Sequence, residues 1–394
     1  MIKPASRLAS IKEYYFSTKL RQIAELRRTG IEIISLGIGG PDLPPPAEVL
    51  DTITQEVQNP DNHGYQPHGG ITELREAFAT WYNKQYGVSV EAASEVLPLI
   101  GSKEGVTHIS LTFLNPGDRV LVPNPGYPTY TSITRLIGAI PVFYNLSEES
   151  GWQPDFDKLE SMDLSGVKIM WLNYPHMPTG APARLETFRK AVDFAKRHNI
   201  LLIHDNPYSM ILNPEPMSLL AIEGARDVAI ELNSLSKSHN MPGWRVGVAV
   251  SNSEFISWIL KVKSNIDSGQ FKPLMLAAAK ALGQSDNWHS ELNKVYCKRR
   301  KIAEKIMTAL GCSFDHNQTG MFLWGRLTDP EIDPIQLADM ILNKARVFIT
   351  PGFIFGSQGE RYIRLSLCAT EKDLNEALRR ISELSLNRKN NWLL

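Results

Sequence analysis

Short runs of apolar residues, many of them β-branched, recur through the first two thirds of the chain, and turn-forming or polar residues bound each run. Near-continuous apolar runs of this length are typical of strands that are buried on both faces of a sheet. We therefore expect strands at residues 95–100, 119–125, 140–146, 168–174, 200–205, 228–234 and 245–250.

Segments with the period of an α-helix separate many of the expected strands. Within residues 71–87, Leu74, Phe78 and Trp81 fall on one helical face, and residues 184–199 repeat the pattern. Strands that alternate with helices predict an α/β fold in which helices cover both faces of a mainly parallel central sheet.

The pattern changes after Asp286, where a smaller α+β unit is expected. Residues 288–310 have the pattern of one long helix, and shorter strand-like segments follow at 322–327 and 361–367. A chain of 394 residues is long enough for about two or three domains. We predict an N-terminal segment that packs with the small domain, a large domain, and a small C-terminal domain, at residues 1–44, 45–285 and 286–394.

Composition and charge restrict the classes of function. Apolar residues make up 43% and charged residues 21% of the chain, as in ordinary soluble proteins. Lysine and arginine total 42, as do aspartate and glutamate, which argues against a nucleic-acid binder. The sequence has no apolar run of about 18 residues, so no membrane span is expected. The 3 scattered cysteines, and an N-terminus without a signal-peptide core, favour a reducing cytoplasm.

Polar side chains follow directly after several of the expected strands. In an open α/β sheet, ligands bind beyond the carboxyl ends of the strands, so these side chains are expected to lie around one site. The candidates are Ser102, Lys103, Tyr127, Asn173, Asp205, Tyr208, Ser234, Ser236 and Lys237.

Lys237 has the strongest chemical implication, because it follows a strand that is expected to be buried. Desolvation lowers the pKa of a lysine and makes its neutral amine a nucleophile that forms Schiff bases with aldehydes. On spacing alone, a structural lysine paired with a local carboxylate is equally consistent. The neighbours favour the first alternative, because the hydroxyls of Ser234 and Ser236 and the guanidinium of Arg245 suit a phosphate.

Residues 101–105, Gly-Ser-Lys-Glu-Gly, lie between an expected strand and an expected helix, where backbone N–H groups form an anion cradle. A phosphate site beside a Schiff-base lysine suggests pyridoxal phosphate (PLP). Asp205 then suits the pyridine nitrogen, because a carboxylate there keeps the ring protonated and makes it an electron sink. Tyr208 suits the phenolic oxygen and Tyr127 the ring face. A helix cap is the alternative for Asp205, and core packing is the alternative for Tyr127.

Motifs that would indicate other functions are incomplete in this sequence. Residues 37–42 begin like a dinucleotide-binding fingerprint, but the sixth residue is not glycine and prolines follow. Ser234 to Lys237 fit the S-x-x-K motif of β-lactamases, but the chain lacks K-T-G. The 9 histidines show no zinc spacing, so no metal is expected. His204 and Asp205 are neighbours along a strand and point to opposite faces, so they are not expected to act as a pair.

Together these motifs resemble the class I/II aminotransferases of PLP fold-type I, similar to aspartate aminotransferase, over nearly the whole chain. SLSKSHNMPGWRVG resembles the family's Schiff-base segment, LIGSKEG its phosphate-binding turn, NPGYPTY its ring-stacking segment and HDNPY its Asp-x-x-Tyr pair. The resemblance implies that Lys237 carries PLP. It assigns cofactor contacts to Ser102, Lys103, Tyr127, Asp205, Tyr208, Ser234, Ser236 and Arg245.

The resemblance also assigns residues outside the strand ends. SLGIGGPDLPPP resembles the segment whose glycine, Gly39 here, lies near the substrate carboxylate, and RYIRLS resembles the motif whose arginine, Arg364, binds it. GYQPHGGITELREAF resembles the segment that sends a tyrosine, Tyr65, to the phosphate of the neighbouring subunit. A homodimer with shared active sites is implied. The resemblance also implies ping-pong transfer of an amino group between an L-amino acid and a 2-oxo acid, with 2-oxoglutarate as the expected acceptor.

One departure from the family concerns Met177. The family usually has asparagine before Pro-Thr-Gly, where it donates to the phenolic oxygen of the cofactor, and methionine cannot donate. Asn173 is the candidate substitute. Several segments look most like alanine-type and LL-diaminopimelate-type aminotransferases, which leaves the amino donor open. A PLP-dependent β C–S lyase on the same fold and an aminotransferase-like transcription regulator are the remaining alternatives.

Overall fold

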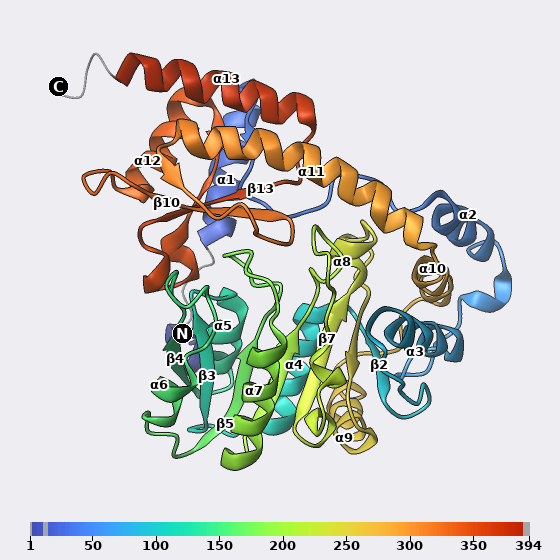
Figure 1. Ribbon diagram of the computed structural model, residues 1–394. Coiled ribbons are helices and arrows are strands. Elements are labelled where there is room, and N and C mark those ends of the chain that lie inside the picture. The colour runs from blue at the N-terminus through green and yellow to red at the C-terminus, as the bar shows by residue number, and fades with distance from the viewer. Residues whose placement is uncertain (1, 11–14, 389–394) are drawn as a thin grey trace.

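A seven-stranded sheet forms the centre of the larger part of the molecule in the computed structural model, which describes residues 2–10 and 15–388 (Figure 1). Its strands are β2 (Val96–Leu99), β3 (Arg119–Asn124), β4 (Ile140–Asn145), β5 (Val167–Leu172), β6 (Leu201–Asp205), β7 (Ala229–Ser234) and β8 (Gly247–Val250). The order across the sheet is β2-β8-β7-β6-β5-β3-β4. Strand β8 runs opposite to the other six strands of this sheet, so the predicted mainly parallel sheet is confirmed.

Helices cover both faces of this sheet, as the alternating pattern predicted. One face packs against α4 (Ser102–Phe113), α5 (Pro128–Leu136) and α9 (Ser253–Lys263). The other packs against α3 (Thr72–Tyr86), α6 (Phe156–Glu160), α7 (Leu185–His198) and α10 (Lys272–Leu282), and α2 (Ala47–Glu56) contributes to the same core. In β3, Val120 and Val122 join the first core and Leu121 the second, because successive side chains of a strand point to opposite faces.

Local sequence signals end and begin several of these helices. Helix α3 ends at Gly87, which has φ +66°, a conformation that glycine adopts without steric cost. Helix α7 ends at Asn199 with φ 52°, which asparagine tolerates. Helix α9 begins after Asn252, whose side chain accepts a hydrogen bond from the N–H of Phe255 at 2.9 Å.

Strand β4 differs from the expectation of full burial. It lies at the edge of the sheet, and Ile140 and Phe143 are 50% and 44% exposed. An apolar run predicts a strand but not its place in the sheet, because the order of strands depends on contacts between distant segments.

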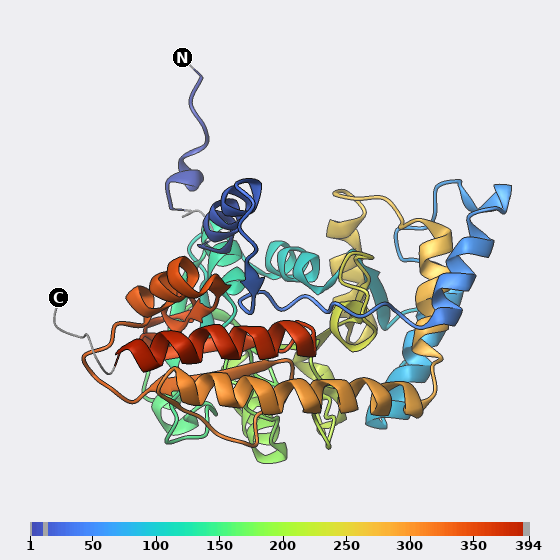
Figure 2. The same cartoon turned by 90° about the horizontal axis from the view of Figure 1, so that it is seen from above.

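The second, smaller sheet is built mainly from the C-terminal part of the chain. It consists of β9 (Cys312–Ser313), β10 (Phe322–Leu327), β12 (Thr350–Pro351) and β13 (Tyr362–Ser366), all antiparallel. A separate parallel pair joins β1 (Ile34–Ser35) to β11 (Val347–Phe348). Helices α11 (Asp286–Ala309) and α13 (Glu371–Arg388) lie side by side over this part, together with α12 (Pro334–Met340) (Figure 2).

The N-terminal segment packs with the C-terminal part of the chain. Helix α1 (Tyr15–Arg28) contributes Phe16 and Ile23 to a hydrophobic core that is otherwise formed largely by residues 292–381. A backbone hydrogen bond also joins the N-terminal segment to the C-terminal part, because the N–H of Leu36 donates to the carbonyl of Phe348 at 2.8 Å. The domain limits at 1–44, 45–285 and 286–394 stay predictions. Within residues 2–10 and 15–388, no helix is both long enough and apolar enough to cross a membrane.

Candidate active site

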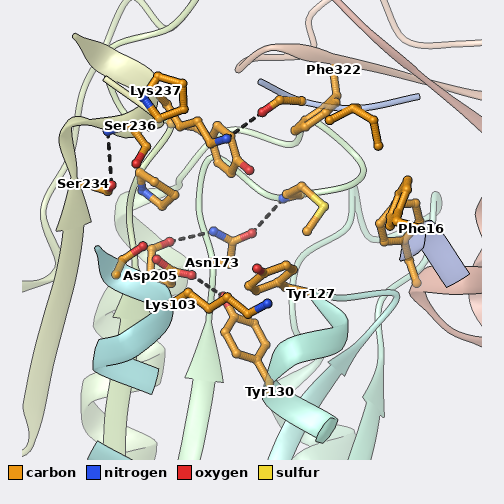
Figure 3. Close-up of a pocket in the computed structure, with 18 of the residues that line it drawn as sticks. Phe16, Lys103, Tyr127, Tyr130, Asn173, Asp205, Ser234, Ser236, Lys237 and Phe322 are labelled. Atoms are coloured by element: carbon orange, nitrogen blue, oxygen red, sulfur yellow. Dashed lines mark hydrogen bonds between the residues drawn. The ribbon is translucent and has the colours of Figure 1, made fainter. Parts of the chain in front are cut away.

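A pocket of ≈ 400 Å³ lies at the carboxyl ends of the large sheet, and side chains of β10 and β13 line its other side (Figure 3). The pocket brings together every predicted site residue except Tyr65. These residues are Gly39, Ser102, Lys103, Tyr127, Asn173, Asp205, Tyr208, Ser234, Ser236, Lys237, Arg245 and Arg364.

Lys237 enters the pocket from α8 (Leu235–Ser238), the short helix that follows β7. The side chain of Ser234 caps this helix by accepting a hydrogen bond from the N–H of Ser236 at 3.2 Å. Lys237 Nζ donates to the carbonyl of Gly39 at 2.6 Å. Burial lowers the pKa of Lys237, and the positive charges of Arg364 and Arg245 lower it further. A lowered pKa favours the neutral amine that Schiff-base chemistry requires.

A cradle for an anion forms where β2 passes into α4. Ser102 and Lys103 begin this helix, so its first backbone N–H groups point at the pocket. Arg245 lies just before β8 and forms the other side of the cradle, and its Nη1 donates to Ser236 Oγ at 3.3 Å. Gly101 has φ +82°, and a Cβ at this position would overlap the guanidinium of Arg245. The glycine therefore allows the arginine to approach the helix N-terminus.

Asp205 lies at the end of β6 and is 5% exposed. Its Oδ2 accepts a hydrogen bond from the hydroxyl of Tyr130 at 2.8 Å, while its buried Oδ1 has no hydrogen-bond partner among the described residues. Burial raises the pKa of Asp205 to about 6, although the bond from Tyr130 acts in the opposite direction. The carboxylate thus has one oxygen available for a hydrogen-bond donor in the pocket.

Tyr127 and Tyr208 face the same pocket from different elements. Tyr127 immediately precedes α5, and its ring meets the edge of the Tyr130 ring with centroids 5.5 Å apart. Tyr208 packs edge-on against Phe322 at 5.7 Å. Burial raises the pKa of both phenols, so both hydroxyls keep their protons and can donate at neutral pH.

Asn173 already uses both ends of its side-chain amide. Its Nδ2 donates to the backbone carbonyl of Asp205 at 2.6 Å, and its Oδ1 accepts from the N–H of Met177 at 2.8 Å. Asn173 lines the pocket, so a contact with the cofactor stays a prediction. The observed bonds give it a definite structural role, which is to fix the ends of β5 and β6 relative to the Met177 segment.

Arg364 on β13 is enclosed by aromatic rings and is 4% exposed. Its guanidinium carbon lies 4.0 Å from the ring centroid of Phe322, 4.6 Å from that of Phe355 and 5.6 Å from that of Phe16. Its Nη2 donates to the carbonyl of Gly37 at 2.7 Å, and its Nη1 contacts the sulfur of Met177 at 3.3 Å. Met177 therefore lies beside the arginine that is expected to bind the substrate carboxylate.

Gly39 contacts both Lys237 and Phe322, one of the rings that surround Arg364. Its carbonyl accepts from Lys237, and a Cβ at this position would overlap the ring of Phe322. The segment that carries Gly39 is held to the small sheet, because the carbonyl of Leu36 accepts from the N–H of Ser366 at 2.7 Å. The absence of a side chain at Gly39 thus lets this segment pass between the two sheets.

Tyr65 lies outside the pocket. It is 96% exposed, in the loop that precedes α3. The loop is anchored at His68, whose Nδ1 lies 2.9 Å from the carbonyl oxygen of Asp267. A role for Tyr65 in the site of a second subunit stays a prediction.

Two further clusters of polar side chains do not belong to the pocket. His204 pairs with the carboxylate of Glu231 at 2.8 Å on the opposite side of β6 from Asp205, as the alternation of the strand predicted. Glu104, His108 and Asp267 place three potential ligand atoms for a metal close together. However, Lys263 Nζ lies 2.5 Å from Asp267 Oδ1, so the carboxylate of Asp267 is already paired with an ammonium group.

Several pocket residues were missed by sequence reasoning. Tyr130 lies in the first turn of α5, three positions after the predicted Tyr127 that precedes this helix, and this spacing is a signal that could have identified it. Phe16, Phe322 and Phe355 come from segments far apart in the sequence, and no local pattern marks them as neighbours of Arg364.

Comparison with known proteins agrees with this geometry. Residues 31–381 match the family model "Aminotransferase class I and II". The chain belongs to this family. It is 38% identical over 385 residues to a protein named LL-diaminopimelate aminotransferase from Nitratidesulfovibrio vulgaris, which covers 97% of this chain and 99% of the relative.

Solved structures extend the likeness to the fold. The apo structure of BacF from Bacillus subtilis has a TM-score of 0.93 and 36% identity, and the match covers 98% of this chain and 99% of that one. An aminotransferase from Staphylococcus aureus has a TM-score of 0.88 and 32% identity, over 97% of this chain and 99% of that one. The protein is thus an aminotransferase that depends on PLP.

The residues in the pocket fit PLP. The unpartnered Oδ1 of Asp205 suits a protonated pyridine nitrogen, and the α4 N-terminus with Arg245 suits a phosphate. Lys237 has the lowered pKa that covalent attachment to an aldehyde needs. The three groups lie in one pocket, so a single cofactor molecule can meet all of them.

Proposed function

We propose that the protein moves an amino group between an L-amino acid and a 2-oxo acid by a ping-pong mechanism, with Lys237 as both the attachment point of PLP and the general base. The observation that carries the proposal is that Lys237, Asp205 and Arg364 all line one pocket. Lys237 has a lowered pKa, Arg364 presents a buried cation, and one oxygen of Asp205 accepts no hydrogen bond from the described residues.

Bound PLP supplies an electron sink for the electron pair that is left when the Cα–H bond of the substrate breaks. Arg364 binds the α-carboxylate and so orients that bond toward Lys237. The neutral amine of Lys237 would act as the general base that accepts the proton from Cα. Asp205 keeps the proton on the ring nitrogen, and Tyr208 donates to the phenolic oxygen. Ser234, Ser236, Arg245 and the α4 N-terminus hold the phosphate.

The names of the relatives, together with the sequence, give the substrates to test first. LL-diaminopimelate, aspartate and alanine are the candidate donors, and 2-oxoglutarate is the acceptor expected from the sequence. The competing C–S lyase activity receives no support from relatives that are named aminotransferases. A lyase would release ammonia, a thiol and pyruvate, whereas an aminotransferase converts the bound aldehyde to the amine and yields a 2-oxo acid.

Borohydride reduction of the purified holoenzyme, followed by peptide mapping, tests the attachment point directly. The reduced cofactor is expected on the peptide that contains Lys237. Lys237→Ala is expected to lose at least about 10⁴-fold in turnover, because it removes both the attachment point and the base. Adduct formation at another residue, or normal turnover of the alanine variant, contradicts the assignment.

We also propose that the protein works as a homodimer in a reducing cytoplasm, with Tyr65 of one subunit at the phosphate of the other. The nearly complete exposure of Tyr65 supports this arrangement. Tyr65→Phe should weaken PLP binding without changing the oligomeric state measured by sedimentation. A monomer in solution, or unchanged PLP affinity in the variant, would argue against the shared site.

A further inference from the structure

The loop between α9 and α10, residues 264–271, supports one side of the phosphate cradle. We call it the α9–α10 loop. The side-chain amide of Gln270 in this loop donates to the backbone carbonyl of Arg245 at 2.8 Å. Arg245 has φ 57°, a left-handed conformation that costs free energy in residues with a side chain and therefore depends on support from its surroundings. The bond from Gln270 is one such support, so the loop helps to fix the backbone from which the Arg245 guanidinium reaches the cradle.

A group of largely buried polar side chains ties the α9–α10 loop to the helix that forms the cradle. Asp267 pairs with Lys263 of α9, and the second carboxylate oxygen of Asp267 lies 3.4 Å from Nε2 of His108. The same nitrogen of His108 lies 2.8 Å from Oε1 of Glu104 in α4, and Oε2 of Glu104 accepts from the N–H of Ile100. We call Glu104, His108, Lys263 and Asp267 the Asp267 network. Lys263 is 1% exposed, and separating it from Asp267 would leave an uncompensated buried charge, so the network holds the loop against α4.

The α9–α10 loop also packs against the segment that carries Tyr65. The carbonyl oxygen of Asp267 lies 2.9 Å from Nδ1 of His68. Gly269 lies so close to this segment that a Cβ there would overlap the backbone carbonyl of Gln66. The proposed homodimer places Tyr65 at the phosphate of the neighbouring subunit. The loop thus contacts a proposed phosphate ligand of its own subunit and the segment that presents another to the partner.

We propose that the α9–α10 loop positions phosphate ligands of both active sites of the dimer, Arg245 within its own subunit and Tyr65 for the partner. This inference rests on the proposed function and adds positioning residues to the same site. Gln270 acts through the backbone of Arg245, and Gly269 acts through the backbone of the Tyr65 segment. The Asp267 network fixes the loop to α4, so the two contacts share one support.

Removing the bond from Gln270 tests the contact within one subunit. Gln270→Met keeps a side chain of similar length that cannot donate a hydrogen bond. We expect the affinity of the apo protein for PLP to fall about tenfold, and its affinity for pyridoxal, which lacks the phosphate, to change by less than about twofold. Spectrophotometric titration of the apo protein with each aldehyde measures both affinities.

Gln284→Met is the matched control for this comparison. Gln284 donates to the carbonyl of Lys280 beyond the other end of α10, so its loss should change neither affinity. An equal loss for PLP and pyridoxal in Gln270→Met, or no loss for either, overturns the inference. A wild-type protein that binds neither aldehyde covalently contradicts the proposed function instead.

Hybrid dimers, purified through two different affinity tags, test the contact between subunits. One subunit carries Lys237→Ala, so the only active site of the hybrid belongs to the other subunit. Gly269→Ala is placed in the inactive subunit, where the added methyl group pushes against Gln66 and displaces Tyr65. The PLP concentration that gives half-maximal turnover should then rise about tenfold, although the active subunit has no substitution in its loop.

The arrangement of the substitutions decides between the outcomes. Gly269→Ala in the active subunit should have a smaller effect than in the inactive one, and a larger effect there, or none in either, overturns the inference. Gly283→Ala in the inactive subunit is the control, because a Cβ there would make only ordinary contacts, 3.5 Å from the nearest backbone oxygen. Tyr65→Phe in the inactive subunit separates the failures. An effect of Tyr65→Phe without one of Gly269→Ala overturns the inference alone, whereas no effect of Tyr65→Phe contradicts the proposed shared site.

Discussion

Replacing Asp205 with asparagine separates the cost of a buried carboxylate from its role toward the cofactor. In the protein without PLP, burial raises the pKa of Asp205 from 3.8 to about 6. A group whose pKa is raised by folding gives its full contribution to stability below the unfolded pKa and loses it as pH rises through the folded pKa. The apo protein should therefore lose stability between about pH 4 and pH 7 because of this one residue.

The size of the loss follows from the shift. Roughly two pKa units at 1.36 kcal/mol each correspond to about 3 kcal/mol of unfolding free energy. Asparagine at 205 is nearly isosteric, has no charge to desolvate and still accepts from the hydroxyl of Tyr130. The apo Asp205→Asn variant should thus gain up to about 3 kcal/mol over the wild type at pH 8, and this gain should vanish near pH 4.

Urea denaturation of both apo proteins between pH 4 and pH 8 measures this difference. Reconstitution with PLP should reverse the order, because a protonated ring nitrogen pairs with the aspartate but not with the amide. A stability difference that does not depend on pH would refute the claim that Asp205 is buried with an unpaired oxygen. A variant that binds PLP as tightly as the wild type, with unchanged turnover, would refute its role at the ring nitrogen.

Two other substitutions address the neighbours of these groups. Tyr130→Phe removes the hydroxyl that donates to Asp205 Oδ2, so it should raise the pKa of Asp205 further and destabilise the apo protein at pH 8 by about 1–3 kcal/mol, and by less at pH 4. Equal losses at both pH values, in the same urea titration, would show that the bond does not act on the charged carboxylate. Met177→Asn should lower the pH at which the bound cofactor changes colour by about one unit. An amide that donates a hydrogen bond to the phenolic oxygen weakens the attraction of that oxygen for the proton on the neighbouring imine nitrogen, so the proton is lost at lower pH. Spectrophotometric titration of the holoenzyme measures this shift, and an unchanged midpoint would mean that residue 177 does not reach that oxygen.

The residues at the carboxyl ends of the strands could be predicted because their signals are local. An apolar run fixes where a strand ends, and the parallel arrangement brings such ends to one edge of the sheet. Ser102, Asp205 and Lys237 were identified in this way, and all three line the pocket. The direction of β8 was not predictable from the same signal, because an apolar run reads alike in a parallel and an antiparallel strand.

The surroundings of Arg364 could not be predicted because the contacts there are long-range. Arg364 meets Phe16, Phe322 and Phe355 only because the N-terminal segment and the small sheet fold against the same core. Short motifs specify the chemistry that all members of the family share, and they lie at strand ends that the fold brings together. The side chains that surround Arg364 lie on α1, on the small sheet and in the segment that follows β12. For this reason the local motifs were enough to identify the family, whereas the surroundings of Arg364 became visible only in the three-dimensional structure.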